Sequence, residues 1–272
     1  METMREMITT RGTVARSGDG TEIAFDRLGE GAPVVLVSGA STSRAIHASL
    51  AEVLAADFTV FNYDRRGRGE SGDTLPYAVE RAIEDIGAVI RAGEGSATVF
   101  GNSSGAVLAL HAAAAGLPIT RLALWEPPLM VDPDAPRRQQ EYLTKLTELL
   151  AAGRRGDAIA WFMTAVGLPQ ETIAGMRRAP IWAGLEALAH TLVYDATVMG
   201  DSTLPTGLVS SVNVPTLILT GSDSGAWADN AAQALTATLP ASEQRILHGQ
   251  NHAVDWDVLA PALKEYFGRS AL

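Results

Sequence analysis

A serine between two glycines is the first candidate for chemistry in this sequence. The stretch Gly101-Asn102-Ser103-Ser104-Gly105 follows the β-forming pair Val99-Phe100 and leads directly into an Ala/Leu-rich run that is typical of a helix. A G-x-S-x-G turn between a strand and a helix places its central serine at the apex, with the hydroxyl projecting above the sheet. The pattern predicts Ser103 as a nucleophile; the alternative is a tight turn without chemistry.

A histidine must accompany such a serine, because a hydroxyl is a poor nucleophile at neutral pH until a base takes its proton. His252 follows the last predicted strand and can reach Ser103 across the edge of the sheet. An imidazole titrates near neutral pH and can return the proton to a leaving group. His248, at the end of that strand, is the rival base. The remaining histidines lie on predicted helices. His111 is expected to pack within its helix, and His47 and His190 are expected at the surface or in the helical insertion.

Strand and helix patterns alternate around these residues, which predicts a mostly parallel, doubly wound α/β sheet with helices on both faces. Strands are predicted at Glu22–Leu28, Pro33–Val37, Thr59–Tyr63, Ala97–Phe100, Arg121–Trp125, Pro215–Leu219 and Gln244–Leu247. Helices are predicted at Ser43–Ala56, Tyr77–Ala92, Ser104–Ala115, Ala226–Thr238 and Val258–Phe267.

The alternation stops between Glu126 and Ser211, where helical patterns occur without a convincing strand. We interpret residues 128–211 as a helical cap, inserted into a core domain formed by residues 1–127 and 212–272. Loops at the carboxyl edge of such a sheet normally hold the active site, and a cap at this point would cover them. The alternative is additional scaffold. The helices predicted in it are Gln139–Ala152, Asp157–Val166, Gln170–Arg178 and Gly184–Thr197.

Three motifs in this order resemble those of the α/β-hydrolase family, over about Gly18 to Phe267. They are the serine turn, the segment Asp64-Arg65-Arg66-Gly67-Arg68-Gly69-Glu70-Ser71, and the loop Gly249-Gln250-Asn251-His252. The second is similar to the family's D-x-R-G-x-G-x-S turn after its fourth strand, and the third to its G-x-x-H loop, which carries the catalytic histidine. The resemblance implies an eight-stranded sheet and a catalytic triad of serine, histidine and an acid.

The resemblance also implies an oxyanion hole made of two backbone amides. One is the amide of Ser104, which lies at the N-terminus of a predicted helix, where a developing oxyanion is favoured. The other aligns with Ala40, in the loop after the third strand, where Ser38 replaces the family's usual histidine. A backbone donor tolerates such a replacement.

The acid of the triad has two candidates. The family usually places it three residues after a glycine that ends the seventh strand, which falls on Ser224 here, and Asp223 comes one position early. Otherwise Asp223 is a turn aspartate that caps the next helix. Some branches, haloalkane dehalogenases and the fungal zearalenone lactonase among them, place the acid directly after the sixth strand, which falls on Glu126. A carboxylate at that edge is costly to bury unpaired, and a histidine N–H would satisfy it. We favour Glu126 and keep Asp223 as the alternative.

The serine nucleophile also restricts the reaction, because dehalogenases and epoxide hydrolases of this fold would need an aspartate at position 103. Serine indicates acyl transfer, and we expect the substrate to be a carboxylic ester or lactone of a moderately hydrophobic small molecule. Ligand pockets are mainly apolar, although most apolar residues of a cap must pack its own helices. The candidate pocket residues are Leu129, Trp161, Met163 and Trp182.

Composition excludes several other classes of protein. A formal net charge of −10 argues against nucleic acid or an anionic membrane as the main partner. The absence of cysteine excludes disulfides and thiolate metal sites and suits a cytoplasmic protein. Residues 1–20 carry charges throughout and indicate no signal peptide, and the nearly apolar stretch Ala106–Leu117 is too short to span a bilayer. No metal-ligand set or phosphate-binding loop is recognised, so neither metal nor cofactor is expected.

The sequence thus predicts a cytoplasmic, cofactor-free serine hydrolase in which Ser103 attacks, His252 transfers the proton and an acid orients the histidine. One rival is a cofactor-free perhydrolase, similar to haloperoxidases, that uses the same triad with hydrogen peroxide. Another is a non-catalytic ligand-binding protein of the same fold. Cap helices often take part in dimers in this family, so a homodimer is a further expectation.

Overall fold

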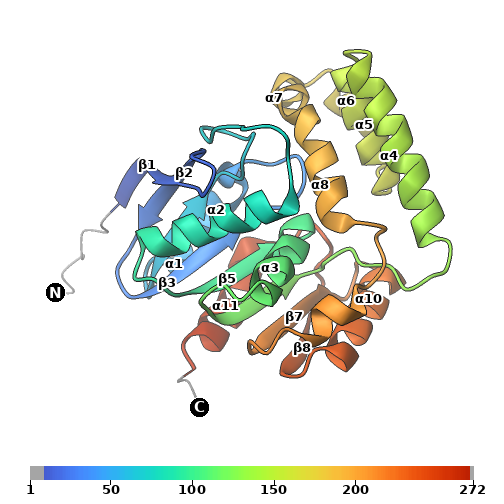
Figure 1. Cartoon of the computed structure of the whole chain (residues 1–272). Helices are drawn as coiled ribbons and strands as arrows, with labels where there is room; N and C mark the ends of the chain where they lie inside the picture. The colour runs from blue at the N-terminus through green and yellow to red at the C-terminus, as the bar shows by residue number, and fades with distance from the viewer. Residues whose placement is uncertain (1–8, 270–272) are drawn as a thin grey trace.

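The computed structural model describes residues 9–269, and a single sheet of eight strands runs through this part of the chain (Figure 1). The strand order is β1-β2-β4-β3-β5-β6-β7-β8. Strand β2 is antiparallel to both of its neighbours, and the other strands are parallel, which confirms the predicted sheet class. The strands are β1 (Thr9–Arg16), β2 (Glu22–Leu28), β3 (Ala32–Val37), β4 (Phe58–Tyr63), β5 (Ala97–Asn102), β6 (Ile119–Trp125), β7 (Thr216–Gly221) and β8 (Ser242–Leu247).

Helices cover both faces of the sheet, which explains why the sequence of strand β3 is continuously apolar. Val35 and Val37 pack into the cluster formed with α2, α3 and α10, whereas Val34 and Leu36 pack into the cluster formed with α1 and α11. A strand that is buried on both faces does not alternate apolar and polar side chains. These helices and the short 3₁₀ helix before α1 are η1 (Arg44–His47), α1 (Ala48–Leu54), α2 (Val79–Ala92), α3 (Ser104–Ala114), α10 (Ala226–Thr238) and α11 (Trp256–Phe267).

The segment between β6 and β7 is helical. Helices α4 to α7 stand together beyond one edge of the sheet, and α8 lies between them and the core helices α2 and α3 (Figure 1). This group has a hydrophobic cluster of its own, which includes Leu146, Ile159 and Leu192. Its arrangement is compatible with a cap at residues 128–211, and that division stays a prediction. The helices are α4 (Ala135–Ala151), α5 (Arg155–Ala165), α6 (Gln170–Met176), α7 (Ile181–Leu188), η2 (Ala189–Thr191), α8 (Leu192–Met199) and α9 (Thr206–Ser210).

Strand β1 is the strand that the sequence patterns missed. It is mostly exposed, with Ala15 its buried apolar residue, and its pairing with β2 is irregular around Gly12. An exposed edge strand lacks the apolar alternation on which strand prediction depends. From the sequence, no signal peptide is expected in residues 1–20. Residues 1–8 of that segment lie outside the described residues. Within residues 9–269, no helix is long and apolar enough to cross a membrane.

The turn after β4 is built around the buried carboxylate of Asp64. Its oxygens accept the backbone N–H groups of Arg44, at 2.7 Å, and of Glu70, at 3.0 Å. Gly69 is required because a Cβ there would lie 2.1 Å from Asp64 Oδ2, and its φ of +53° also favours glycine. The Ser71 hydroxyl donates to the Asp64 carbonyl at 2.6 Å. The D-x-R-G-x-G-x-S motif therefore encodes a rigid turn that holds the start of η1 against β4.

A glycine substitution in α3 tests its packing on the sheet, and one in α7 provides the comparison. A Cβ at Gly105 would lie 2.3 Å from the Val37 carbonyl oxygen, so we expect Gly105→Ala to lower the free energy of unfolding by about 3 kcal/mol. Gly184, within α7, has open space where a Cβ would be added, so Gly184→Ala should raise it by about 0.5 to 1 kcal/mol. Urea unfolding measures both. A Gly105→Ala protein as stable as the wild type would contradict this account of the packing.

Candidate active site

Ser103 lies at the sharp turn between β5 and α3, with φ of +56° and ψ of −129°. Its backbone N–H donates to the Trp125 carbonyl at 2.9 Å, which fixes the turn against the end of β6. The flanking glycines permit the close approach of strand and helix, because a Cβ at Gly101 would lie 2.5 Å from the Gly105 carbonyl oxygen. The strained serine is therefore held by its surroundings, as residues at functional sites often are.

His252 reaches Ser103 from the loop after β8, with its Nε2 3.2 Å from Ser103 Oγ. Two contacts hold this loop: Trp125 Nε1 donates to the His252 carbonyl at 3.2 Å, and the Asp223 N–H donates to the Gln250 carbonyl at 2.8 Å. The imidazole is 44% exposed, so it is open to a substrate while its backbone is fixed. The distance is within the range for proton transfer from the serine in a catalytic complex.

Glu126 lies behind the imidazole and its side chain is completely buried. Its Oε2 is 2.8 Å from His252 Nδ1, and its Oε1 accepts the Gly221 N–H at 2.8 Å and the Ser224 hydroxyl. Three donors thus satisfy a carboxylate that would be costly to bury unpaired. A carboxylate on Nδ1 keeps the proton there and leaves the lone pair of Nε2 facing Ser103.

Asp223 lies at the same edge but makes other contacts. It is exposed, and its carboxylate accepts the Ser222 hydroxyl at 2.8 Å. Ser224, which occupies the position usual for the family's acid, donates instead to Glu126. Because β6 and β7 are neighbours, an acid at the end of either strand can reach the same histidine. The structure brings together Ser103, His252 and Glu126, and it leaves Asp223 out of this group.

The loop after β3 lies against the serine. A Cβ at Gly39 would be 3.1 Å from the Ser103 Cβ, which shows how closely this loop approaches. The Gly39 N–H donates to Asn102 Oδ1 at 3.1 Å, which leaves the next amide, that of Ala40, as the donor of this loop for a negatively charged oxygen. The Ser104 N–H begins α3 on the other side. Two such amides could stabilise a tetrahedral oxyanion, and this role stays a prediction.

The structure contradicts the sequence-based placement of His47 at the surface or in the cap. It is fully buried between Phe100 and Trp256, with ring centroids 5.7 and 5.1 Å away, and its Nε2 lies 2.9 Å from Asn102 Oδ1. Burial lowers its pKa to about 4. The prediction was wrong because the helix was expected to begin smoothly at Ser43, whereas the 3₁₀ turn η1 directs His47 inward. Neutral His47 therefore supports Asn102, which in turn holds the Gly39 amide.

The other histidines lie apart from Ser103. His111 packs as expected, with its Nε2 3.2 Å from the Val198 carbonyl oxygen, and His248 is exposed beyond the end of β8. His190, in η2, lies near Asp73, with 3.5 Å between Nε2 and Oδ2. Of the five histidines, His252 is the one that the structure places beside the serine.

The predicted pocket residues pack in hydrophobic clusters. Trp161, Met163 and Trp182 belong to the hydrophobic cluster of the inserted helices, and Leu129 is buried in the core beside the sheet. Their role in a substrate pocket stays a prediction. The sequence interpretation missed Trp227 in α10, whose ring packs edge-on against His252 with 5.4 Å between centroids. The position of Trp227 just after the Asp223 loop was the sequence signal that could have indicated this contact.

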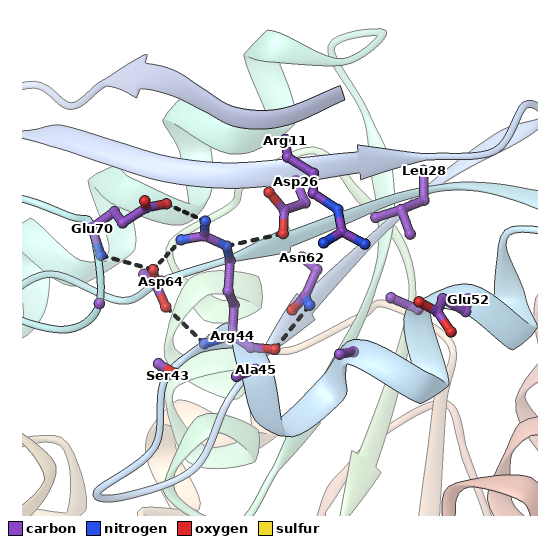
Figure 2. Close-up of a pocket in the computed structure, with 13 residues that line it drawn as sticks. Arg11, Asp26, Leu28, Ser43, Arg44, Ala45, Glu52, Asn62, Asp64 and Glu70 are labelled. Atoms are coloured by element: carbon purple, nitrogen blue, oxygen red, sulfur yellow. Dashed lines mark hydrogen bonds and ion pairs between the residues drawn. The ribbon is translucent and has the colours of Figure 1, made fainter. Parts of the chain in front are cut away.

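A hollow of about 360 Å³ lies away from these residues, beside η1, β2 and β4 (Figure 2). Arg44 crosses it and pairs with Asp26, at 3.1 Å, and also with Asp64 and Glu70. These ions satisfy one another and fasten η1 to the sheet. No group of three or more His, Cys, Asp or Glu side chains in the described part of the chain could hold a metal ion.

A family model described as the alpha/beta hydrolase family matches residues 34–262. The chain belongs to this family. The crystal structure of an alpha/beta hydrolase from Sphaerobacter thermophilus is similar to it, with 54% identity and a TM-score of 0.86 over 94% of this chain and 100% of that chain.

More distant similarities support the fold alone. An esterase from Thermogutta terrifontis is 21% identical, with a TM-score of 0.71 over 94% of this chain and 97% of that chain. An enol-lactonase from Burkholderia xenovorans is 20% identical, with a TM-score of 0.71 over 94% and 100%. N-formylmaleamate deformylase of Pseudomonas putida is 37% identical over 105 residues, which is 37% of this chain. That match spans 39% of the deformylase, so its activity does not transfer.

The two candidate acids predict different results on substitution. Glu126→Gln leaves the shape of the site but removes the charge. The Gly221 N–H and the Ser224 hydroxyl would hold the amide oxygen, so the NH₂ group would face Nδ1 in place of an acceptor. The kcat should therefore fall by about 10³- to 10⁴-fold. Asp223→Asn should leave kcat within about twofold of the wild type, because the carboxylate contacts Ser222 alone among the described side chains. Steady-state hydrolysis of an activated ester measures both. A large loss in Asp223→Asn with an active Glu126→Gln would contradict the assignment.

Proposed function

We propose that this chain is a serine hydrolase that cleaves a carboxylic ester or lactone of a moderately hydrophobic small molecule through an acyl-enzyme on Ser103. The observation that carries the proposal is the continuous chain of contacts from Ser103 Oγ to His252, at 3.2 Å, and from His252 to the buried Glu126, at 2.8 Å. Nucleophile, base and orienting acid in this order are the requirement for activating a serine.

In the first half of the reaction, the Ser103 hydroxyl attacks the substrate carbonyl while His252 Nε2 takes its proton. Glu126 stabilises the imidazolium that forms, and the amides of Ala40 and Ser104 hold the negative charge on the former carbonyl oxygen. The intermediate collapses when the imidazolium gives its proton to the departing alkoxide. This step releases the alcohol, or opens the lactone ring, and leaves the acyl group on Ser103.

In the second half, His252 takes a proton from a water molecule, and the resulting hydroxide attacks the acyl-enzyme. The same amides hold the second oxyanion. Collapse returns the proton to Ser103 Oγ and releases the carboxylic acid. Every proton moves between Ser103, His252, water and the leaving group, so the residues at the site supply all the groups that this ester hydrolysis requires.

The substrate is proposed as a small molecule with an acyl carbon bonded to oxygen. Similarity in fold to a solved esterase and an enol-lactonase agrees with this class. A substrate panel should also contain a formamide, because one partial relative is named a deformylase. We further propose that the protein works in the cytoplasm, without a cofactor and without nucleic acid or membrane as a partner. Light scattering would measure its oligomeric state.

Labelling with a fluorophosphonate tests the nucleophile. We expect one covalent adduct on the wild type by intact mass and none on Ser103→Ala, with kcat for esters reduced by at least about 10⁴-fold in the variant. Ser210→Ala is the matched control, because Ser210 is exposed in α9 and bonds the Gly207 carbonyl, and it should label like the wild type. Labelling of Ser103→Ala, or an absence of labelling on folded wild type, would contradict the proposal.

A further inference from the structure

A buried ion cluster lies beneath the loop that approaches Ser103. Arg65 and Arg68, from the turn after β4, and Asp195, from α8, are each at most 5% exposed. Arg65 Nη1 lies 2.8 Å from Asp195 Oδ1, and Arg68 Nη2 lies 2.7 Å from Asp195 Oδ2. Burial would raise the pKa of Asp195, but the charges of Arg68 and Arg65 lower it below its ordinary value. One carboxylate of the inserted helices therefore faces two guanidinium groups of the core.

The same two arginines hold carbonyl groups of the loop after β3, residues 38–40, which we call the oxyanion loop. Arg65 Nη1 donates to the Ser38 carbonyl at 3.2 Å, and Arg68 Nη1 donates to the Gly39 carbonyl at 2.5 Å. The Thr42 hydroxyl donates to the same Gly39 oxygen at 2.9 Å. These contacts fix two successive peptide groups of the loop from below.

The geometry of the peptide bond connects these contacts to the site. The Gly39 carbonyl and the Ala40 N–H belong to one planar trans peptide group, in which the C=O and N–H bonds point in opposite directions. A guanidinium that holds the carbonyl on one side therefore directs the Ala40 N–H to the other side. A hydrogen bond on the carbonyl also polarises the peptide and makes its N–H a stronger donor.

The second amide is tied to the same carboxylate. The Ser104 hydroxyl donates to Asp195 Oδ1 at 2.8 Å, and Ser104 is the residue whose N–H begins α3 beside Ser103. Asp195 thus contacts Ser104, which supplies one amide of the oxyanion hole. It also contacts both arginines that hold the loop of the other amide, that of Ala40. A single side chain of α8 joins the two halves of the oxyanion hole.

We propose that Arg68, held in place by Asp195 of α8, is a positioning residue that aims and polarises the Ala40 N–H toward the oxyanion. The inference rests on the proposed function, since it concerns the same acyl-transfer site. It assigns to the inserted helices a part in forming the oxyanion hole, in addition to any part in covering the substrate. Neither Arg68 nor Asp195 touches the reacting atoms.

Arg68→Met is the most informative substitution. It removes the guanidinium from the Gly39 carbonyl and replaces it with an apolar chain suited to the buried site. It also leaves Arg65 and Asp195 as a one-to-one pair, so no buried charge loses its partner. The melting temperature should stay within about 3 °C of the wild type. The kcat should fall by about 10- to 100-fold with KM within about twofold, because the loss concerns an interaction made in the transition state.

A trifluoromethyl ketone provides a readout that a merely structural role would not change. It forms a hemiketal with the serine whose oxyanion occupies the hole, so its inhibition constant should rise in Arg68→Met by the same factor as kcat/KM falls. The control is Tyr194→Phe, next to Asp195 on α8. It removes the hydroxyl that bonds Asp73 at 2.9 Å, a contact between α8 and the core outside the oxyanion loop. It should retain kcat and inhibitor affinity.

A folded Arg68→Met protein with wild-type kcat would overturn the inference, as would an equal loss in Tyr194→Phe. If Arg68→Met does not fold, Arg68→Lys replaces it. Its single ammonium group keeps the charge but cannot hold the Gly39 carbonyl and Asp195 in the same forked geometry. The same kcat deficit is expected, and wild-type kcat would again overturn the inference. Failure of the proposed function is distinguishable, because wild-type protein would then not be labelled by the fluorophosphonate.

Discussion

The need to satisfy one buried carboxylate organises the site. Glu126 has no exposed side-chain surface, so each oxygen must find donors within the protein. Those donors come from three separate places: the end of β7 at Gly221, the following loop at Ser224, and the loop after β8 at His252. Satisfying Glu126 therefore fixes the imidazole against Ser103. A parallel sheet makes this possible, because it brings the carboxyl ends of β5, β6 and β7 to one edge.

Much of this arrangement could be predicted from short-range patterns. The serine turn and the late histidine loop follow strands whose apolar runs are continuous, and the strand order of the family implies that they meet. The choice between Glu126 and Asp223 was less determined by sequence, because adjacent strand ends are interchangeable as sources of an acid. Ser224 held a clue, since a hydroxyl at the family's acid position can serve as a donor to a carboxylate on the next strand.

The remaining features depend on contacts between distant residues, which periodicity does not reveal. Nothing near Asp195 in the sequence indicates that it meets Arg65 and Arg68, more than 120 residues earlier along the chain. His47 was misplaced because the direction of a short 3₁₀ turn decides whether its side chain faces the core or solvent. The apolar residues of the inserted helices could not be divided between packing and pocket, and the structure places Trp182 among the packed ones.

The central claim is that Ser103 carries the acyl group during turnover, and trapping that intermediate tests it most directly. The wild-type protein would be mixed with an activated ester such as p-nitrophenyl butyrate, quenched in acid during steady-state turnover, digested and mapped by mass spectrometry. The account predicts a butyryl group on the peptide that contains Ser103, in an amount that rises to a steady level during turnover. Turnover without an acyl group on that peptide, or with the acyl group on another residue, would contradict it.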